Sequence, residues 1–147
     1  MSNKRKTTES DTNQRASGIR RRPPTALLVD DALDSRDMYG EVLRQGGYRV
    51  LEAADGADAL ALALGEHPDI IVTDLCMPRM DGWEAVRRLK SDPQTRCIPV
   101  VVLTALGWRS GAVEVECDAY LVKPCLGLDL LGVLDALLAE ASQAERA

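Results

Sequence analysis

Short apolar runs alternate along the chain with longer segments in which apolar residues recur at every third or fourth position. The runs are rich in β-branched residues and predict strands. They lie at 25–30, 48–53, 69–74, 98–104 and 119–122. The intervening segments have helical spacing and predict helices at 34–47, 55–68, 83–92 and 126–143, with a short helix within 107–116. Five strands therefore alternate with five helices.

The first, third and fourth predicted strands are continuous apolar runs, without polar residues at alternate positions. Such strands are typical of a parallel sheet that helices cover on both faces. We therefore expect an α/β fold with a doubly wound, five-stranded parallel sheet and five helices. In open sheets of this kind, functional groups gather at the carboxyl ends of the strands.

The ends of the chain differ in composition from its middle. Residues 1–24 contain almost nothing apolar and finish in Pro23-Pro24, so we expect a disordered tail there. We expect the folded domain to cover residues 25–141, with a short tail at 142–147. The first 24 residues carry a net charge of +5, which leaves −10 on the remainder. An acidic body argues against nucleic acid as a partner.

Other classes of site and location are disfavoured by what the chain lacks. No apolar run approaches the roughly 18 residues needed to span a bilayer, and the basic N-terminus is not followed by an apolar stretch. We therefore expect a cytoplasmic protein without a membrane partner. The four cysteines form no CxxC pair, and the chain has one histidine, so a zinc site is not expected.

Polar residues follow four of the predicted strands. Asp30 and Asp31 follow the first, Asp74 the third, Thr104 ends the fourth and Lys123 follows the fifth. Three carboxylates brought to one edge repel one another and call for a cation, and an all-oxygen cluster suits Mg²⁺. A nearby hydroxyl and ammonium would complete a site for a phosphoryl group, with one aspartate as nucleophile.

The motifs at these strand ends resemble those of the receiver domain of response regulators in two-component signalling. The resemblance extends from about residue 26 to 139 and rests on "LLVDDALDSR" (27–36), "EAADGADAL" (52–60), "DIIVTDLCMPRMDGWEAVRRLK" (69–90), "IPVVVLTAL" (98–106) and "DAYLVKP" (118–124). It implies the flavodoxin-like strand order 2-1-3-4-5.

The same resemblance assigns roles to individual residues. It implies that Asp74 accepts the phosphoryl group and that Lys123 pairs with a phosphate oxygen. Asp31 would be the more direct Mg²⁺ ligand, Asp30 would act through bound water, and Asp74 and the main-chain carbonyl of Cys76 would complete the protein's share of the metal shell. Each residue has a simpler reading by itself; Asp30 or Asp31, for example, could cap the first helix.

The resemblance also implies a switch. Thr104 would move toward the phosphoryl group, and Tyr120 would swing inward behind it, although Tyr120 could equally be a packing residue. The Lys123–Pro124 bond is commonly cis in the family. The fourth helix and fifth strand form the family's usual partner surface, and a homodimer through that face remains open.

The implied function is that of a phosphoacceptor that takes its phosphoryl group from a sensor histidine kinase or a histidine phosphotransfer protein. Because the chain ends in "ASQAERA", at the end of the last predicted helix, we expect a stand-alone domain that signals to an unknown downstream protein by altered contacts. A receiver fragment of a hybrid kinase or larger regulator is the alternative. A phosphatase with Asp74 as nucleophile is less favoured, because Asp74 is followed by Leu75-Cys76 rather than by a DxD pattern.

Two departures from the family pattern affect these expectations. The segment between Thr104 and Lys123 is about three residues shorter than is common, nearly one helical turn, so the fourth helix is expected to be short or irregular. Cys76 and Leu106 are rather apolar residues at positions that flank the path of an attacking water.

We predict from these two apolar residues that the phosphoryl group is lost slowly, over minutes or longer, because water has poor access to it. Loading with acetyl phosphate and following the decay of the phosphorylated form measures this lifetime. Loss within seconds would contradict the prediction.

Overall fold

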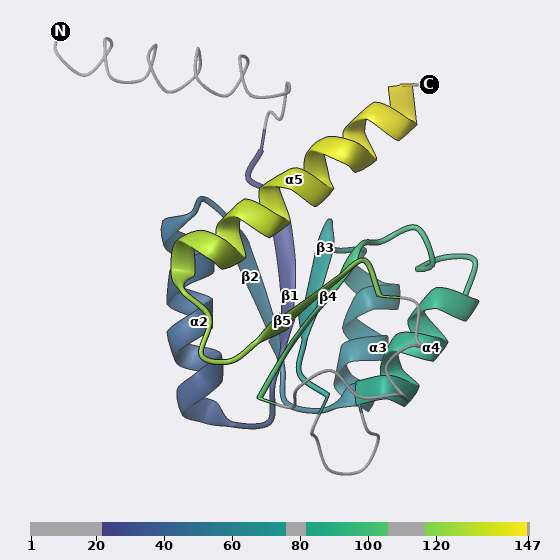
Figure 1. The fold of residues 1–147 in the computed structure, drawn as a ribbon. Helices are drawn as coiled ribbons and strands as arrows, with labels where there is room; N and C mark the ends of the chain where they lie inside the picture. The colour runs from purple at the N-terminus through teal and green to yellow at the C-terminus, as the bar shows by residue number, and fades with distance from the viewer. Residues whose placement is uncertain (1–21, 76–81, 106–116, 147) are drawn as a thin grey trace, which may run out of the picture.

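The computed structural model describes residues 22–75, 82–105 and 117–146. Five strands and four helices lie within these ranges (Figure 1). Their bounds are β1 (Thr25–Val29), α2 (Leu33–Gln45), β2 (Arg49–Ala53), α3 (Gly56–Glu66), β3 (Ile70–Thr73), α4 (Gly82–Ser91), β4 (Val100–Thr104), β5 (Ala119–Val122) and α5 (Gly127–Arg146). These elements match the predicted ones within a few residues at each end.

The five strands form one parallel sheet in the order β2-β1-β3-β4-β5, which confirms the expected fold. Every residue of β1, β3 and β4 is buried, as the continuous apolar runs predicted. Figure 1 shows α2 and α5 on one face of the sheet and α3 and α4 on the other. The three central strands are therefore covered on both faces.

Alternate residues of the central strands enter two separate cores. On the side of α3 and α4, the buried residues include Leu27, Val29, Ile71, Val100, Val102, Ala59, Ala63, Val86 and Leu89. On the side of α2 and α5, they include Leu28, Ile70, Val72, Val101, Leu103, Tyr39, Leu43, Leu130 and Leu134. Both cores are almost wholly aliphatic, which agrees with a chain that contains no phenylalanine.

The C-terminal end of α2 packs closely on α5. The helix is capped by Gly46, and a Cβ at this position would lie 2.3 Å from Leu131 Cδ2. Gly47 follows with a φ of 94°, a conformation that favours glycine. Tyr48 Oη then donates a hydrogen bond of 2.7 Å to Asp135 of α5. The glycine pair that ends α2 thus also lets the two helices approach each other.

Two expectations need further comment. The helix α5 runs to Arg146, so residues assigned to a tail at 142–147 are helical as far as Arg146. The short helix expected within 107–116 lies outside the described residues. No helix in the described ranges has the length and apolarity that a bilayer span requires.

Two leucines of α5 allow a matched test of this arrangement. Leu134 is fully buried and Leu128 is 85% exposed. We expect Leu134→Ala to lower the free energy of unfolding by about 2–5 kcal/mol, since the substitution opens a cavity between α5 and the sheet. Leu128→Ala should change it by less than about 0.5 kcal/mol. Urea unfolding of both variants measures the difference, and equal effects would contradict the packing of α5.

Candidate functional site

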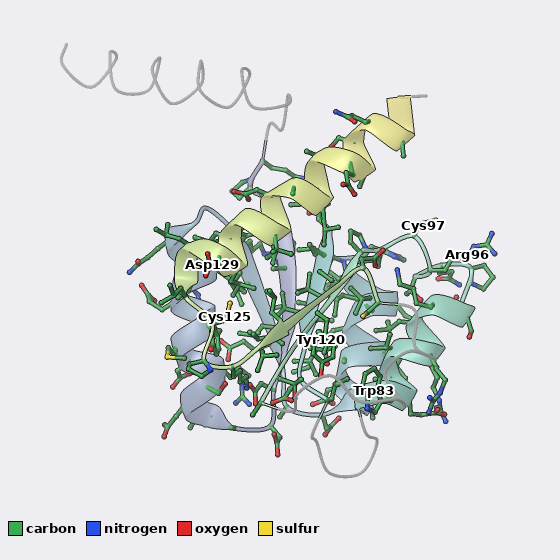
Figure 2. All side chains as sticks on the ribbon, in the orientation of Figure 1. Trp83, Arg96, Cys97, Tyr120, Cys125 and Asp129 are labelled. Carbon is green, nitrogen blue, oxygen red and sulfur yellow. The ribbon has the colours of Figure 1, made fainter. Side chains whose placement is uncertain are left out.

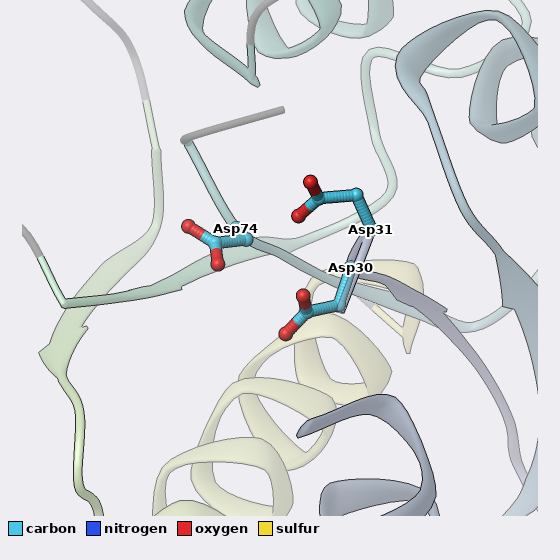
Figure 3. Close-up of side chains that lie close together, drawn as sticks. All are labelled: Asp30, Asp31 and Asp74. Atoms are coloured by element: carbon cyan, nitrogen blue, oxygen red, sulfur yellow. The ribbon is translucent and has the colours of Figure 1, made fainter. Parts of the chain in front are cut away.

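The polar residues predicted at strand ends meet at one edge of the sheet. Asp30 follows β1 and Asp74 follows β3, and these strands are paired in parallel so that Val29 lies beside Thr73. One carboxylate oxygen from each of Asp30, Asp31 and Asp74 lies within 4.8 Å of the others (Figure 3). The register of two neighbouring strands therefore brings the acidic cluster together.

The three carboxylates differ in their exposure to solvent. Asp30 is 2% exposed and Asp74 is 8% exposed, whereas Asp31 is an exposed residue. Two buried carboxylates this close together are costly unless positive charge and hydrogen bonds compensate them. The nearest compensation from the protein comes from Lys123.

Lys123 reaches both buried carboxylates from the end of β5. Its Nζ lies 2.6 Å from Asp30 Oδ2 and 3.0 Å from Asp74 Oδ2. Burial by itself lowers the pKa of Lys123, but the hydrogen bonds to Asp30 and Asp74 outweigh it, so that the pKa is raised above its usual value. The side chain therefore stays an ammonium throughout the neutral range. The peptide bond from Lys123 to Pro124 is cis, as the resemblance implied.

Asp74 is held in place through its main chain and its side chain. Its N–H donates to the carbonyl of Val29 at 2.9 Å, and its Oδ1 accepts from the N–H of Leu75 at 2.6 Å. Gly82, the first residue of α4, packs directly on this turn, because a Cβ there would lie 2.3 Å from the Asp74 carbonyl oxygen. Glycine at this position lets α4 begin against the main chain of Asp74.

Asp30 is equally constrained. Its Oδ1 accepts from the N–H of Ala32 at 2.9 Å, and its Oδ2 accepts from Ser35 Oγ at 2.7 Å as well as from Lys123. Arg36 donates to the Asp30 main-chain carbonyl at 2.7 Å. The contacts with Ala32, Ser35 and Arg36 all come from the segment that leads into and begins α2.

The remaining predicted site residues lie on the side of β4 and β5. Thr104 is fully buried at the end of β4, beside Val122 of β5. Tyr120 is half-buried on β5 and packs against the core on the side of α3 and α4 (Figure 2). Cys76 lies outside the described residues, as does Leu106.

Three residues of α2 that contact the site were not predicted from the sequence: Ser35, Arg36 and Tyr39. Tyr39 belongs to the apolar pattern of the segment predicted as a helix at 34–47, and that pattern by itself indicates a core position. A signal was present, because Ser35 and Tyr39 are four residues apart and so share the helix face that follows the Asp30-Asp31 pair. Their contacts with the fifth strand's end could not be read from spacing alone.

The donors of this cluster fit a hard divalent cation. Asp30, Asp31 and Asp74 offer carboxylate oxygens only, and the exposure of Asp31 leaves one side of the cluster open to solvent. Oxygen ligands with room for water are what Mg²⁺ prefers. A single ammonium also leaves the three carboxylates with a net negative charge, which a cation would offset.

Comparison with known proteins decides the family. The family model described as the response regulator receiver domain matches residues 26–135. The chain belongs to this family. Receiver domains are phosphoacceptor signalling switches that typically bind Mg²⁺ and interact with histidine kinases or phosphotransfer proteins.

Relatives of this receiver domain differ in overall length. Protein PilH of Pseudomonas aeruginosa is 36% identical over 121 residues, which cover 77% of this chain and 96% of PilH. A gliding motility regulatory protein of Myxococcus xanthus is 39% identical over 108 residues, 71% of this chain but 14% of that protein. The match likewise spans about half the length of two curated transcriptional regulators.

A solved structure has the same fold. The receiver domain of the sensor histidine kinase PA1611 from Pseudomonas aeruginosa is 28% identical, with a TM-score of 0.75. The match covers 80% of this chain and 98% of that one. That crystal structure has a magnesium ion coordinated in its active site cleft.

Proposed function

We propose that Asp74 is the phosphoacceptor of this receiver domain. One observation carries the assignment: of the three clustered carboxylates, Asp74 is the one held by the Leu75 N–H, by the Lys123 ammonium and by the start of α4 against its main chain. A nucleophile held in one orientation needs little reorganisation to meet its donor. Asp31 is exposed, and Asp30 is tied to the start of α2 by hydrogen bonds from Ala32 N–H and Ser35 Oγ.

The proposed transfer begins with a phosphorylated histidine of a sensor histidine kinase or a histidine phosphotransfer protein. A carboxylate oxygen of Asp74 attacks the phosphorus, the bond to the histidine nitrogen breaks, and that nitrogen keeps the electron pair and takes up a proton. Lys123 already lies 3.0 Å from Asp74 Oδ2. As negative charge develops on a phosphoryl oxygen, the Lys123 ammonium would exchange its contact with Asp74 for one with that oxygen without a large movement.

Asp30, Asp31 and Asp74 would hold Mg²⁺, together with the Cys76 carbonyl that the family pattern implies. Bound there, the ion would supply positive charge to offset the charge on the phosphoryl oxygens. The support is the chemistry of the donors, since all three side chains offer oxygen and one of them faces solvent. The likeness to the magnesium-bound PA1611 receiver agrees with this choice.

We further propose that the signal leaves the site through Thr104 and Tyr120. Thr104 ends β4 next to β5, and Tyr120 lies on β5 with its ring against the core on the side of α3 and α4. A phosphoryl group on Asp74 would attract the Thr104 hydroxyl and so disturb the packing at Tyr120. The surface beside β5 would then present altered contacts to a downstream protein, or to a second copy of the chain.

The domain would act as a phosphoacceptor rather than as an enzyme with its own substrate. It would be located in the cytoplasm, where it would meet its histidine kinase. The match of residues 26–135 to the receiver-domain family supports this signalling role. Its test is whether the protein takes up a phosphoryl group on one defined side chain.

We expect acetyl phosphate and Mg²⁺ to add one phosphoryl group to the wild-type protein and none to Asp74→Asn, since the amide is not a nucleophile. Intact-protein mass spectrometry detects the added group. Asp129→Asn, which changes an exposed carboxylate of α5, is the matched control and should be labelled like the wild type. Labelling of Asp74→Asn to the wild-type level would refute the assignment.

Magnesium should raise the melting temperature of the wild-type protein, because a ligand that binds the folded state stabilises it by mass action. Asp31→Asn should largely abolish this increase, and without Mg²⁺ it should melt at or above the wild-type temperature, since one of the clustered charges is gone. Asp37→Asn, at an exposed position of α2, is the control. Thermal melts with and without Mg²⁺ measure both effects; an equal increase in Asp31→Asn would contradict the metal site.

A further inference from the structure

Helix α2 contacts the end of β5 through two residues that share one face. Ser35 Oγ accepts a hydrogen bond of 2.7 Å from Lys123 Nζ. The ring centre of Tyr39, one helical turn further on, lies 5.7 Å from the same nitrogen. Both contacts join residues more than 80 positions apart in the sequence. Lys123 is therefore held from the side of α2 as well as by the two carboxylates.

Tyr39 also binds the chain beyond the lysine. Its hydroxyl oxygen accepts a hydrogen bond of 3.1 Å from the N–H of Cys125. Tyr39 is 2% exposed, so its ring and hydroxyl are fixed by the surrounding core. One buried side chain thus contacts the residues on both sides of Pro124 and sets where the connection from β5 to α5 begins.

The Lys123 ammonium has three protons, and three acceptors face them: Asp30 Oδ2, Ser35 Oγ and Asp74 Oδ2. Ser35 in turn donates its own proton to Asp30 Oδ2 at 2.7 Å. The Ser35 hydroxyl therefore accepts a hydrogen bond from the ammonium, and both groups donate a hydrogen bond to Asp30 Oδ2. Both effects limit how far Lys123 is drawn toward Asp30 and away from Asp74.

We propose that Ser35 and Tyr39 are positioning residues that hold the Lys123 ammonium within reach of Asp74. This proposal rests on the function proposed above, since it assumes that Lys123 meets the phosphoryl group on Asp74. When that group forms, the contact of Lys123 with Asp74 Oδ2 is exchanged for one with a phosphoryl oxygen. The contacts of Lys123 with Ser35 and Tyr39 do not involve Asp74, so they hold the lysine through the exchange.

The first experiment compares Ser35→Ala with Ser35→Thr, which keeps the hydroxyl. With saturating Mg²⁺ and acetyl phosphate, we expect Ser35→Ala to be phosphorylated about tenfold more slowly, because a hydrogen bond to a charged group is lost. Ser35→Thr should recover most of the rate. Urea unfolding should show Ser35→Ala to be fully folded under the assay conditions, with a midpoint lowered by no more than the loss of one hydrogen bond explains, so the slower rate is not a general structural defect.

Ser91→Ala is the matched control, because the Ser91 hydroxyl donates to a carbonyl of its own helix, far from the site. It should be phosphorylated at the wild-type rate. If Ser35→Ala is also phosphorylated at the wild-type rate, or if Ser35→Thr is as slow as Ser35→Ala, the role of the hydroxyl is refuted.

The second experiment tests Tyr39 with Tyr39→Phe, which keeps the ring and removes the hydroxyl. The Cys125 amide should exchange faster with solvent, and phosphorylation should slow severalfold. Tyr48→Phe removes a comparable hydroxyl, from the hydrogen bond to Asp135, and should leave the phosphorylation rate unchanged. A wild-type rate in Tyr39→Phe would refute the part of the proposal that concerns Tyr39.

A nuclear magnetic resonance readout separates this proposal from the proposed function. The chain has four lysines, so the side-chain signal of Lys123 is readily assigned in protein with labelled lysine. Before any phosphorylation, Ser35→Ala should shift this signal and Ser91→Ala should not. If the wild type takes up no phosphoryl group, the proposed function fails, and the lysine signal still decides whether Ser35 positions Lys123; an unshifted signal would overturn that.

Discussion

Two carboxylates buried side by side are the constraint on which the rest of this structure depends. The parallel pairing of β1 with β3 places Asp30 and Asp74 at neighbouring strand ends, where both are more than nine-tenths buried. Their repulsion is not screened by water, so the fold must supply compensation from elsewhere in the chain. The compensation is the Lys123 ammonium, which lies within 3.0 Å of both side chains.

The two aliphatic cores make this placement unavoidable. Alternate residues of β1 and β3 pack on opposite faces of the sheet, so a slip of one residue would bring each strand's side chains to the wrong core. The register is therefore fixed by apolar packing along the strands, and the polar residues at their ends are carried to fixed positions. Hydrophobic burial provides the free energy that holds the like charges together.

The strands and the site residues at their ends could be predicted because both leave a local signal in the sequence. Continuous apolar runs mark β1, β3 and β4, and a polar residue follows each run. The spacing of Ser35 and Tyr39 shows that they share one face of α2, but it does not show what that face contacts. The last helix also runs further than the predicted end at residue 143, to Arg146. The sequence "ASQAER" contains no Gly or Pro to mark an end, and its alanines favour a continued helix.

The contacts of Lys123 also indicate where the free energy of switching arises. With Asp74 as the proposed phosphoacceptor, it is the one acceptor of the three that changes chemically when the phosphoryl group is added; Asp30 and Ser35 are the same groups before and after. Contacts that persist in both states stabilise both and do not favour either one. The difference between the states must therefore come from the new charge on Asp74 and from the groups that move toward it. Many contacts fix Asp30 and Lys123 in place. Little of the free-energy difference between the two states is therefore lost in rearranging the site itself.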